Sequence, residues 1–195
     1  KPVWRLKTPT TGEPCGSKKR MRSPITIATW NIHGSPGDAD LLAVLVDLDA
    51  DVIGLQECPE DTVTHAVDAL GGTWQGMWAG AEYLGNGLLT RLPVHSEQAL
   101  WLPGGRSAAH LTTPLHGRLL PIVCTHLDHV DAATRLDQWD ALCDALDDLP
   151  QAVLLGDLNA LTRSDRTDDD WHDIARHRSM SGWEPPQSLL MDAIA

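Results

Sequence analysis

Short apolar segments alternate with polar turns along most of the chain. Residues 25–30 form a β-rich run, and residues 52–55 and 152–155 are short apolar runs typical of buried strands. Each of the three runs ends directly before polar residues. Further strands are predicted at residues 73–79, 87–91, 94–102, 107–113 and 118–126, where Gly and Pro mark the turns between them.

Helical periodicity separates these strand segments. Asp38 and Asp61 are candidate caps for two helices, the first through Leu48 and the second ending at Gly71. Asp131 opens a third helix with an apolar stripe at three- and four-residue spacing, formed by Leu136, Trp139, Leu142, Leu146 and Leu149. Two shorter helices are expected at residues 171–177 and 188–195. This order predicts an α/β fold in which helices flank two packed sheets.

Charge divides the chain into two parts. Residues 1–22 hold seven of the 15 basic residues, whereas the rest carries eight arginines against 26 acidic residues, a net charge of −18. We therefore expect an unstructured basic leader at 1–22, with a nucleic-acid arm as the alternative, and one domain at 23–195. With 42% hydrophobic residues the domain is long enough for a buried core. Its acidity disfavours tight binding to a phosphate backbone.

Composition also bears on location. No apolar run approaches the roughly 18 residues of a membrane span, and no signal-peptide pattern is present. The four cysteines lack C-x-x-C spacing, and Cys124 and Cys143 lie among apolar residues. We expect buried thiols at these two positions and a cytoplasmic protein.

Candidate chemistry lies at the ends of predicted strands. Asn31, Glu57, His126 with Asp128, and Asp157 with Asn159 each follow a strand, and most are hard oxygen donors suited to a metal ion. An isolated Asp-x-Asn is more typical of a turn, because both side chains bond to nearby backbone. The repetition of such groups at several strand ends favours a functional site.

Five ordered motifs strengthen this interpretation. They are Thr29-Trp30-Asn31, Leu55-Gln56-Glu57, the segment from Gly85 to Arg91, Thr125-His126-Leu127-Asp128 and Gly156-Asp157-Leu158-Asn159. Together they resemble the successive motifs of the endonuclease/exonuclease/phosphatase superfamily. The resemblance implies a DNase I-like sandwich of two sheets whose active site lies at one end.

The resemblance also implies roles for individual residues. Asn31 and Glu57 would bind Mg²⁺ or Mn²⁺, and Asp157 and Asn159 would orient the attacking water and bind phosphoryl oxygens. His126 would donate a hydrogen bond or a proton near the scissile phosphate. Arg106 and Asn86 would face the substrate. The implied function is a divalent-metal-dependent phosphoesterase that works by in-line attack of water on a phosphate ester.

The sequence departs from the family pattern at its C-terminal end. The family carries a further aspartate and a Ser-Asp-His-like ending there, whereas this sequence ends at Ala195 and offers only His172 and His177 earlier. We therefore expect the last strands to be missing and turnover to be low. A non-catalytic domain or binding module is the alternative.

Substrate identity is left open by the motifs. Any phosphate ester fits, and nucleic acid is disfavoured by the acidic body. A zinc hydrolase is a weak alternative, because Thr125-His126-Leu127-Asp128-His129 only partly matches the metallo-β-lactamase pattern. Most tryptophans are expected in the core, with Trp171 and Trp183 the candidates for stacking on a base. Oligomeric state and the number of metal ions remain undetermined.

Overall fold

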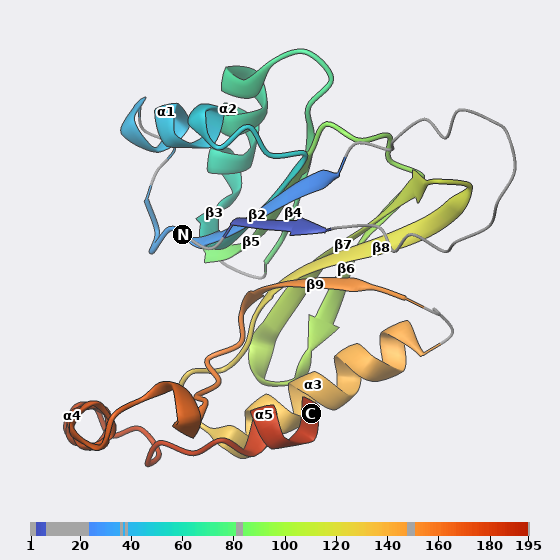
Figure 1. Cartoon of the computed structure of the whole chain (residues 1–195). Helices are drawn as coiled ribbons and strands as arrows, with labels where there is room; N and C mark the ends of the chain where they lie inside the picture. Colours follow the sequence, from blue (N-terminus) through green and yellow to red (C-terminus); the bar gives the residue numbers. More distant parts are fainter. Residues whose placement is uncertain are drawn as a thin grey trace, which may run out of the picture.

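The computed structural model describes residues 3–6, 24–35, 37, 39–80, 84–147 and 151–194. Two sheets pack face to face, with helices on both outer sides (Figure 1). The first sheet has the order β1-β2-β3-β5-β4, with β1 Val3–Leu6, β2 Ile25–Asn31, β3 Val52–Pro59, β4 Gln75–Ala79 and β5 Leu84–Thr90. The second runs β6-β7-β8-β9, with β6 Ser96–Leu102, β7 Arg106–Leu115, β8 Arg118–His126 and β9 Val153–Asp157.

Helices form the two outer layers. α1 (Ala39–Asp47) and α2 (Glu60–Leu70) cover the first sheet, whereas α3 (Ala132–Leu146) and α5 (Leu189–Ile194) lie beside the second (Figure 1). α4 (Asp168–Met180) lies beyond the end of β9, and two short 3₁₀ turns, η1 (Pro103–Gly105) and η2 (Arg163–Asp165), complete the elements. The predicted α/β sandwich flanked by helices is confirmed.

Each sheet contains one parallel strand pair. β2 pairs in parallel with β3, which places Asn31 opposite Gln56, and β8 pairs in parallel with β9, which places His126 opposite Asp157. The remaining pairs are antiparallel. Parallel strands end at the same edge of a sheet. The polar residues that follow these four strands are therefore brought to one end of the sandwich.

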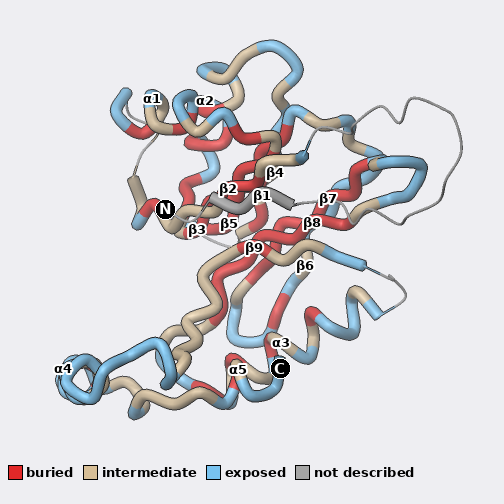
Figure 2. Tube along the Cα trace, in the orientation of Figure 1, coloured by how far each residue is buried: buried red, intermediate tan, exposed pale blue. Residues whose placement is uncertain are grey.

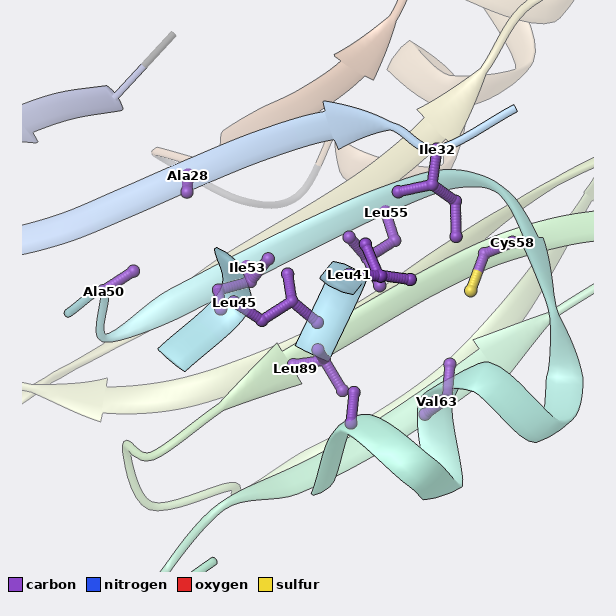
Figure 3. Packing of buried hydrophobic residues seen from close by; sticks show 11 residues of the cluster. Ala28, Ile32, Leu41, Leu45, Ala50, Ile53, Leu55, Cys58, Val63 and Leu89 are labelled. Carbon is purple, nitrogen blue, oxygen red and sulfur yellow. The ribbon is translucent and has the colours of Figure 1, made fainter. Parts of the chain in front are cut away.

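Three apolar layers hold the elements together. One lies between α1, α2 and the first sheet, and Figure 3 shows Leu41 and Leu45 of α1 against Ile53 and Leu55 of β3. The second fills the space between the sheets, and the third joins the second sheet to α3 and α5. Buried positions accordingly concentrate along the central strands, whereas α4 is largely exposed (Figure 2).

Several local expectations need correction. Residues 3–6 fall within the segment expected to be unstructured, yet they form β1, paired with β2; the rest of 1–22 and the proposed cap Asp38 lie outside the described residues. α2 begins at Glu60 after Pro59 rather than at a cap from Asp61. Cys124 is buried, but Cys143 is exposed on α3, because it falls on the face turned away from the sheet.

Gly156 in β9 should be the position least tolerant of a side chain. Its φ of +145° is one that L-residues rarely adopt, and an added Cβ would lie 1.9 Å from the carbonyl oxygen of Thr125. We predict that Gly156→Ala lowers the free energy of unfolding in urea by more than about 3 kcal/mol.

The matched control is Gly182→Ala. Gly182 has a φ of +71° but no atom within 4 Å of an added Cβ. Its substitution should cost only roughly 1–2 kcal/mol, the ordinary penalty of a left-handed residue. Equal losses in the two variants would show that the close approach of β8 is relieved elsewhere.

Candidate active site

A pocket of about 490 Å³ lies at the end of the sandwich where the parallel strands terminate. Six of the seven predicted site residues line it, namely Glu57, Asn86, Arg106, His126, Asp157 and Asn159. The seventh, Asn31, hydrogen-bonds to two of them. The hydrogen bond from Asn31 to Asp157 thus joins residues that are 126 positions apart in sequence.

Glu57 occupies an irregularity in β3. The register with β5 shifts between Gln56 and Cys58, and Glu57 has a φ of +49°, in the left-handed region. Such a bulge turns one side chain out of the regular alternation. Here it presents the Glu57 carboxylate to the pocket, where Oε2 lies 3.1 Å from Nδ1 of His33. A strained conformation of this kind is typical of a functional residue.

Asn31 links the two carboxylates of the site. Its Nδ2 donates to Glu57 Oε1 at 2.9 Å and to Asp157 Oδ2 at 3.2 Å, while its Oδ1 accepts from the backbone N–H of His33. A single amide group thus joins the first sheet to the second. Within the described residues no three His, Cys, Asp or Glu side chains form a metal cluster. Two carboxylates and an amide nevertheless fit Mg²⁺, which binds few protein ligands and keeps several waters.

The turn after β9 holds the remaining acidic group. Asp157 Oδ1 accepts from the backbone N–H of Asn159, and Asn159 Nδ2 donates to the carbonyl of Leu127. Asn159 has a φ of +48°, again left-handed. The turn conformation typical of Asp-x-Asn is therefore present, and it places both side chains on the pocket wall.

His126 is a buried histidine that lines the pocket. Burial lowers its pKa from the usual 6.5, and the nearby Arg106 lowers the pKa further, while Asp157 and Glu57 act in the opposite direction. Its Nδ1 lies 3.9 Å from Glu57 Oε1. The imidazole is consequently neutral at neutral pH and has one N–H available as a donor.

Arg106 is held in place by the loop after β8. The Nη2 atom of Arg106 lies 3.0 Å from Nδ1 of His129 and 3.9 Å from Oδ2 of Asp128. Since arginine can only donate, Nδ1 of His129 acts as the acceptor. Asp128 also caps the loop, accepting from the backbone N–H groups of Val130 and Asp131. Among the described residues, His126, Asp128 and His129 do not form a group of three side chains that could hold a metal ion.

Asn86 has a free acceptor. The residue is 3% exposed, its Nδ2 donates to the carbonyl of Ser107, and its Oδ1 is buried without a hydrogen-bond partner. A buried polar atom of this kind calls for a ligand or water. Because the unused atom is an oxygen, it suits a hydrogen-bond donor rather than a phosphate oxygen.

Two pocket residues received no role in the site predicted from the sequence, and Trp183 was only one of two stacking candidates. His33 and His129 have no diagnostic spacing, and only their contacts with Glu57 and Arg106 reveal them. Trp183 lines the pocket, whereas the other stacking candidate, Trp171, packs under the guanidinium of Arg163. No sequence signal separated these two tryptophans.

A buried ionic network fixes the wall that carries Trp183. Glu184 accepts from the side chains of Arg135 and Arg178 and from the backbone N–H of Ala132. Arg135 also donates to the carbonyl of Asp128. α3, α4 and the pocket loop are thus tied to one carboxylate.

Most of the chain matches a known protein family. Residues 28–188 match the sequence model of the "Endonuclease/Exonuclease/phosphatase family". No curated protein matches the chain.

None of the described helices has the length and apolar character needed to cross a membrane.

Several solved structures share the fold. TDP2 from D. rerio, complexed with a single-strand DNA product, is 20% identical (TM-score 0.59; 71% of this chain and 62% of that chain). A mannosyl-6-phosphatase from Bacteroides thetaiotaomicron is 17% identical (TM-score 0.55; 71% of this chain and 66% of that chain). ANGEL2, a 2′,3′-cyclic phosphatase, is also 17% identical (TM-score 0.54; 64% of this chain and 44% of that chain). The chain spans less than two thirds of the length of each.

The lowered pKa of His126 predicts a pH dependence of stability. The unfolded chain takes up a proton near pH 6.5, whereas the folded state resists it because the imidazole is buried. The free energy of unfolding should therefore be highest above pH 6.5 and fall as the pH drops toward the folded-state pKa.

The measurement is urea denaturation across this range in EDTA, for the wild type and His126→Asn. The variant should lose less stability on acidification. His110, whose pKa burial also lowers, contributes in the same direction and remains in both proteins. An NMR titration that gave His126 a pKa above 6.5 would contradict the prediction.

Proposed function

The chain belongs to the endonuclease/exonuclease/phosphatase family, and we propose that it is a divalent-metal-dependent phosphoesterase. The observation that carries the proposal is the pairing of Glu57 and Asp157 through Asn31 inside the pocket. Two carboxylates so close to one another favour a positive partner. A cation and a phosphate ester together would meet this requirement.

Asn31 and Glu57 would hold the cation, with Mg²⁺ or Mn²⁺ suited to their oxygen atoms. When bound, the ion neutralises charge that develops on the phosphoryl oxygens. Holding it would require the Asn31 amide to give up its bonds to the carboxylates and turn its oxygen inward. While the Asn31 amide turns, the hydrogen bond from His33 to Glu57 Oε2 would keep the Glu57 carboxylate oriented.

Asp157 and Asn159 would position the attacking water. Asp157 accepts the proton as the water oxygen bonds to phosphorus, and the bond from phosphorus to the leaving oxygen breaks on the opposite side. The leaving oxygen departs as an alcohol after protonation by solvent. Asn159 and the neutral His126 donate hydrogen bonds to phosphoryl oxygens, where positioned donors stabilise developing charge.

Arg106 and Asn86 would act on the substrate in different ways. Arg106 presents a guanidinium to the phosphate, with His129 fixing its orientation. Asn86 offers only its free Oδ1, so it would accept from the attacking water or from a hydroxyl of the substrate. This distinction refines the role expected from the sequence alone.

The proteins of similar fold are associated with chemically diverse phosphate compounds. TDP2 was solved with a single-strand DNA product, ANGEL2 is a 2′,3′-cyclic phosphatase, and the Bacteroides protein is a mannosyl-6-phosphatase. The feature common to these compounds is the phosphate ester. We therefore assign the chain a phosphate ester as its substrate, with nucleic acid duplexes disfavoured by the charge of −18 on residues 23–195.

Glu57→Gln tests the metal site. The substitution keeps the size of the side chain but removes the charge that would hold the cation. We predict loss of Mn²⁺ binding in calorimetric titration and a fall of about 10²-fold or more in hydrolysis of bis-p-nitrophenyl phosphate. The matched control is Glu60→Gln, an exposed glutamate at the start of α2, which should behave as wild type.

Two outcomes would contradict the assignment. One is undiminished Mn²⁺ binding by Glu57→Gln; the other is hydrolysis by the wild type that persists in EDTA. Mn²⁺ binding without hydrolysis of any phosphate ester would instead support a non-catalytic binding module.

Asp157→Asn tests the base. It preserves the shape of the turn but cannot accept the proton of water. We expect kcat to fall by about 10²- to 10⁴-fold, measured with the same ester, while Asp137→Asn on the exposed face of α3 retains full activity. Equal activity of the two variants would remove Asp157 from the mechanism.

A further inference from the structure

The pocket is lined mainly by polar residues but includes an aromatic side chain, Trp183. Most of its lining side chains are charged, polar or glycine, and the only large apolar ones among the described lining residues are Leu84 and Trp183. Trp183 is partly buried, so part of its indole ring is accessible. A phosphate needs none of this apolar surface. Trp183 must therefore meet another part of the ligand or serve only to pack the loop.

Contacts within the protein fix the position of the indole ring. The ring of His129 meets it at 4.8 Å between centroids with an interplanar angle of 75°, and the ring of His177 meets it at 6.0 Å and 74°. The guanidinium of Arg178 lies 5.6 Å from the ring centroid. The neighbouring Glu184 is anchored by two arginines. The tryptophan is thus pre-organised, which reduces the entropy lost when a ligand binds.

Trp183 is also continuous with the phosphate-facing part of the pocket. His129 contacts Trp183 with its ring and accepts from Arg106 through Nδ1 at 3.0 Å. One wall therefore presents first a guanidinium and then an aromatic surface. A ligand whose phosphate meets Arg106 would carry its next group toward Trp183.

We propose that Trp183 and His129 form a subsite for a planar aromatic ring attached to the phosphate ester, such as a nucleobase. The proposal rests on the phosphoesterase function given above and specifies its substrate class. Aromatic side chains stack on bases irrespective of sequence. A quaternary ammonium group could also contact an indole, but Arg106, which is joined to this wall through His129, carries a positive charge that would repel it.

The test compares a nucleotide with the sugar phosphate that lacks its base, and with a phosphate ester that carries a quaternary ammonium group. Affinities of adenosine 5′-monophosphate, ribose 5-phosphate and phosphocholine are measured by calorimetry with Ca²⁺ present. We expect the nucleotide to bind about 5- to 150-fold more tightly than ribose 5-phosphate, the range set by stacking of one base. Phosphocholine should bind no more tightly than ribose 5-phosphate.

Variants assign the difference to Trp183. Trp183→Ala should bring the affinity ratio of nucleotide to sugar phosphate close to one without changing the affinity for ribose 5-phosphate, while Trp183→Phe should retain most of the ratio. Trp171→Ala is the matched control, because Trp171 stacks with Arg163 and does not line the pocket. Circular dichroism checks that each variant folds, and the wild-type ratio remains decisive where one does not.

The outcomes separate the two proposals. Equal affinities for the nucleotide and ribose 5-phosphate, with metal-dependent hydrolysis of phosphate esters intact, would overturn the aromatic subsite alone. Failure of every phosphate ligand to bind, together with absence of hydrolysis, would overturn the phosphoesterase function and the subsite with it. An unchanged ratio in Trp183→Ala would also exclude the subsite.

Discussion

The pocket depends on the register of two parallel strand pairs. β2 with β3 and β8 with β9 end at the same side of the sandwich, so Asn31, Glu57, His126 and Asp157 meet although they come from different sheets. A slip of one residue in either pair would turn these side chains to the opposite face. Gly156 protects the second register, because only a residue without Cβ allows β9 to approach Thr125 so closely.

Local electrostatics would allow this strongly acidic protein to receive the anionic ester proposed as its substrate. Glu57 and Asp157 are bridged by one amide, while Arg106 stands beside a histidine that burial keeps neutral. The negative charges are thus concentrated where a cation would bind, and the fixed positive charge lies on the adjacent wall. In the proposed function, access of the phosphate would depend on the bound ion and on Arg106 rather than on the net charge of −12.

The helical layer below the second sheet contributes to the site as well as to stability. Gln138, fully buried on α3, accepts from the backbone N–H of Asp128 and donates to the carbonyl of Pro103. These bonds fix the loops on either side of Arg106. Glu184 performs the corresponding task for Trp183 by joining Arg135 to Arg178. Packing of α3 and orientation of the pocket wall that carries Arg106 and Trp183 are therefore coupled.

The sequence alone determined most strands and helices and the polar residues at strand ends, because apolar periodicity and short motifs are local. It also predicted a set of polar residues, from Asn31 to Asn159, that the fold then gathers at one pocket. Tertiary structure decided what depends on distant contacts. The pairing of β1 with β2, the bulge at Glu57, the attachment of His129 to Arg106 and the choice of Trp183 over Trp171 all arise from packing between segments remote in sequence.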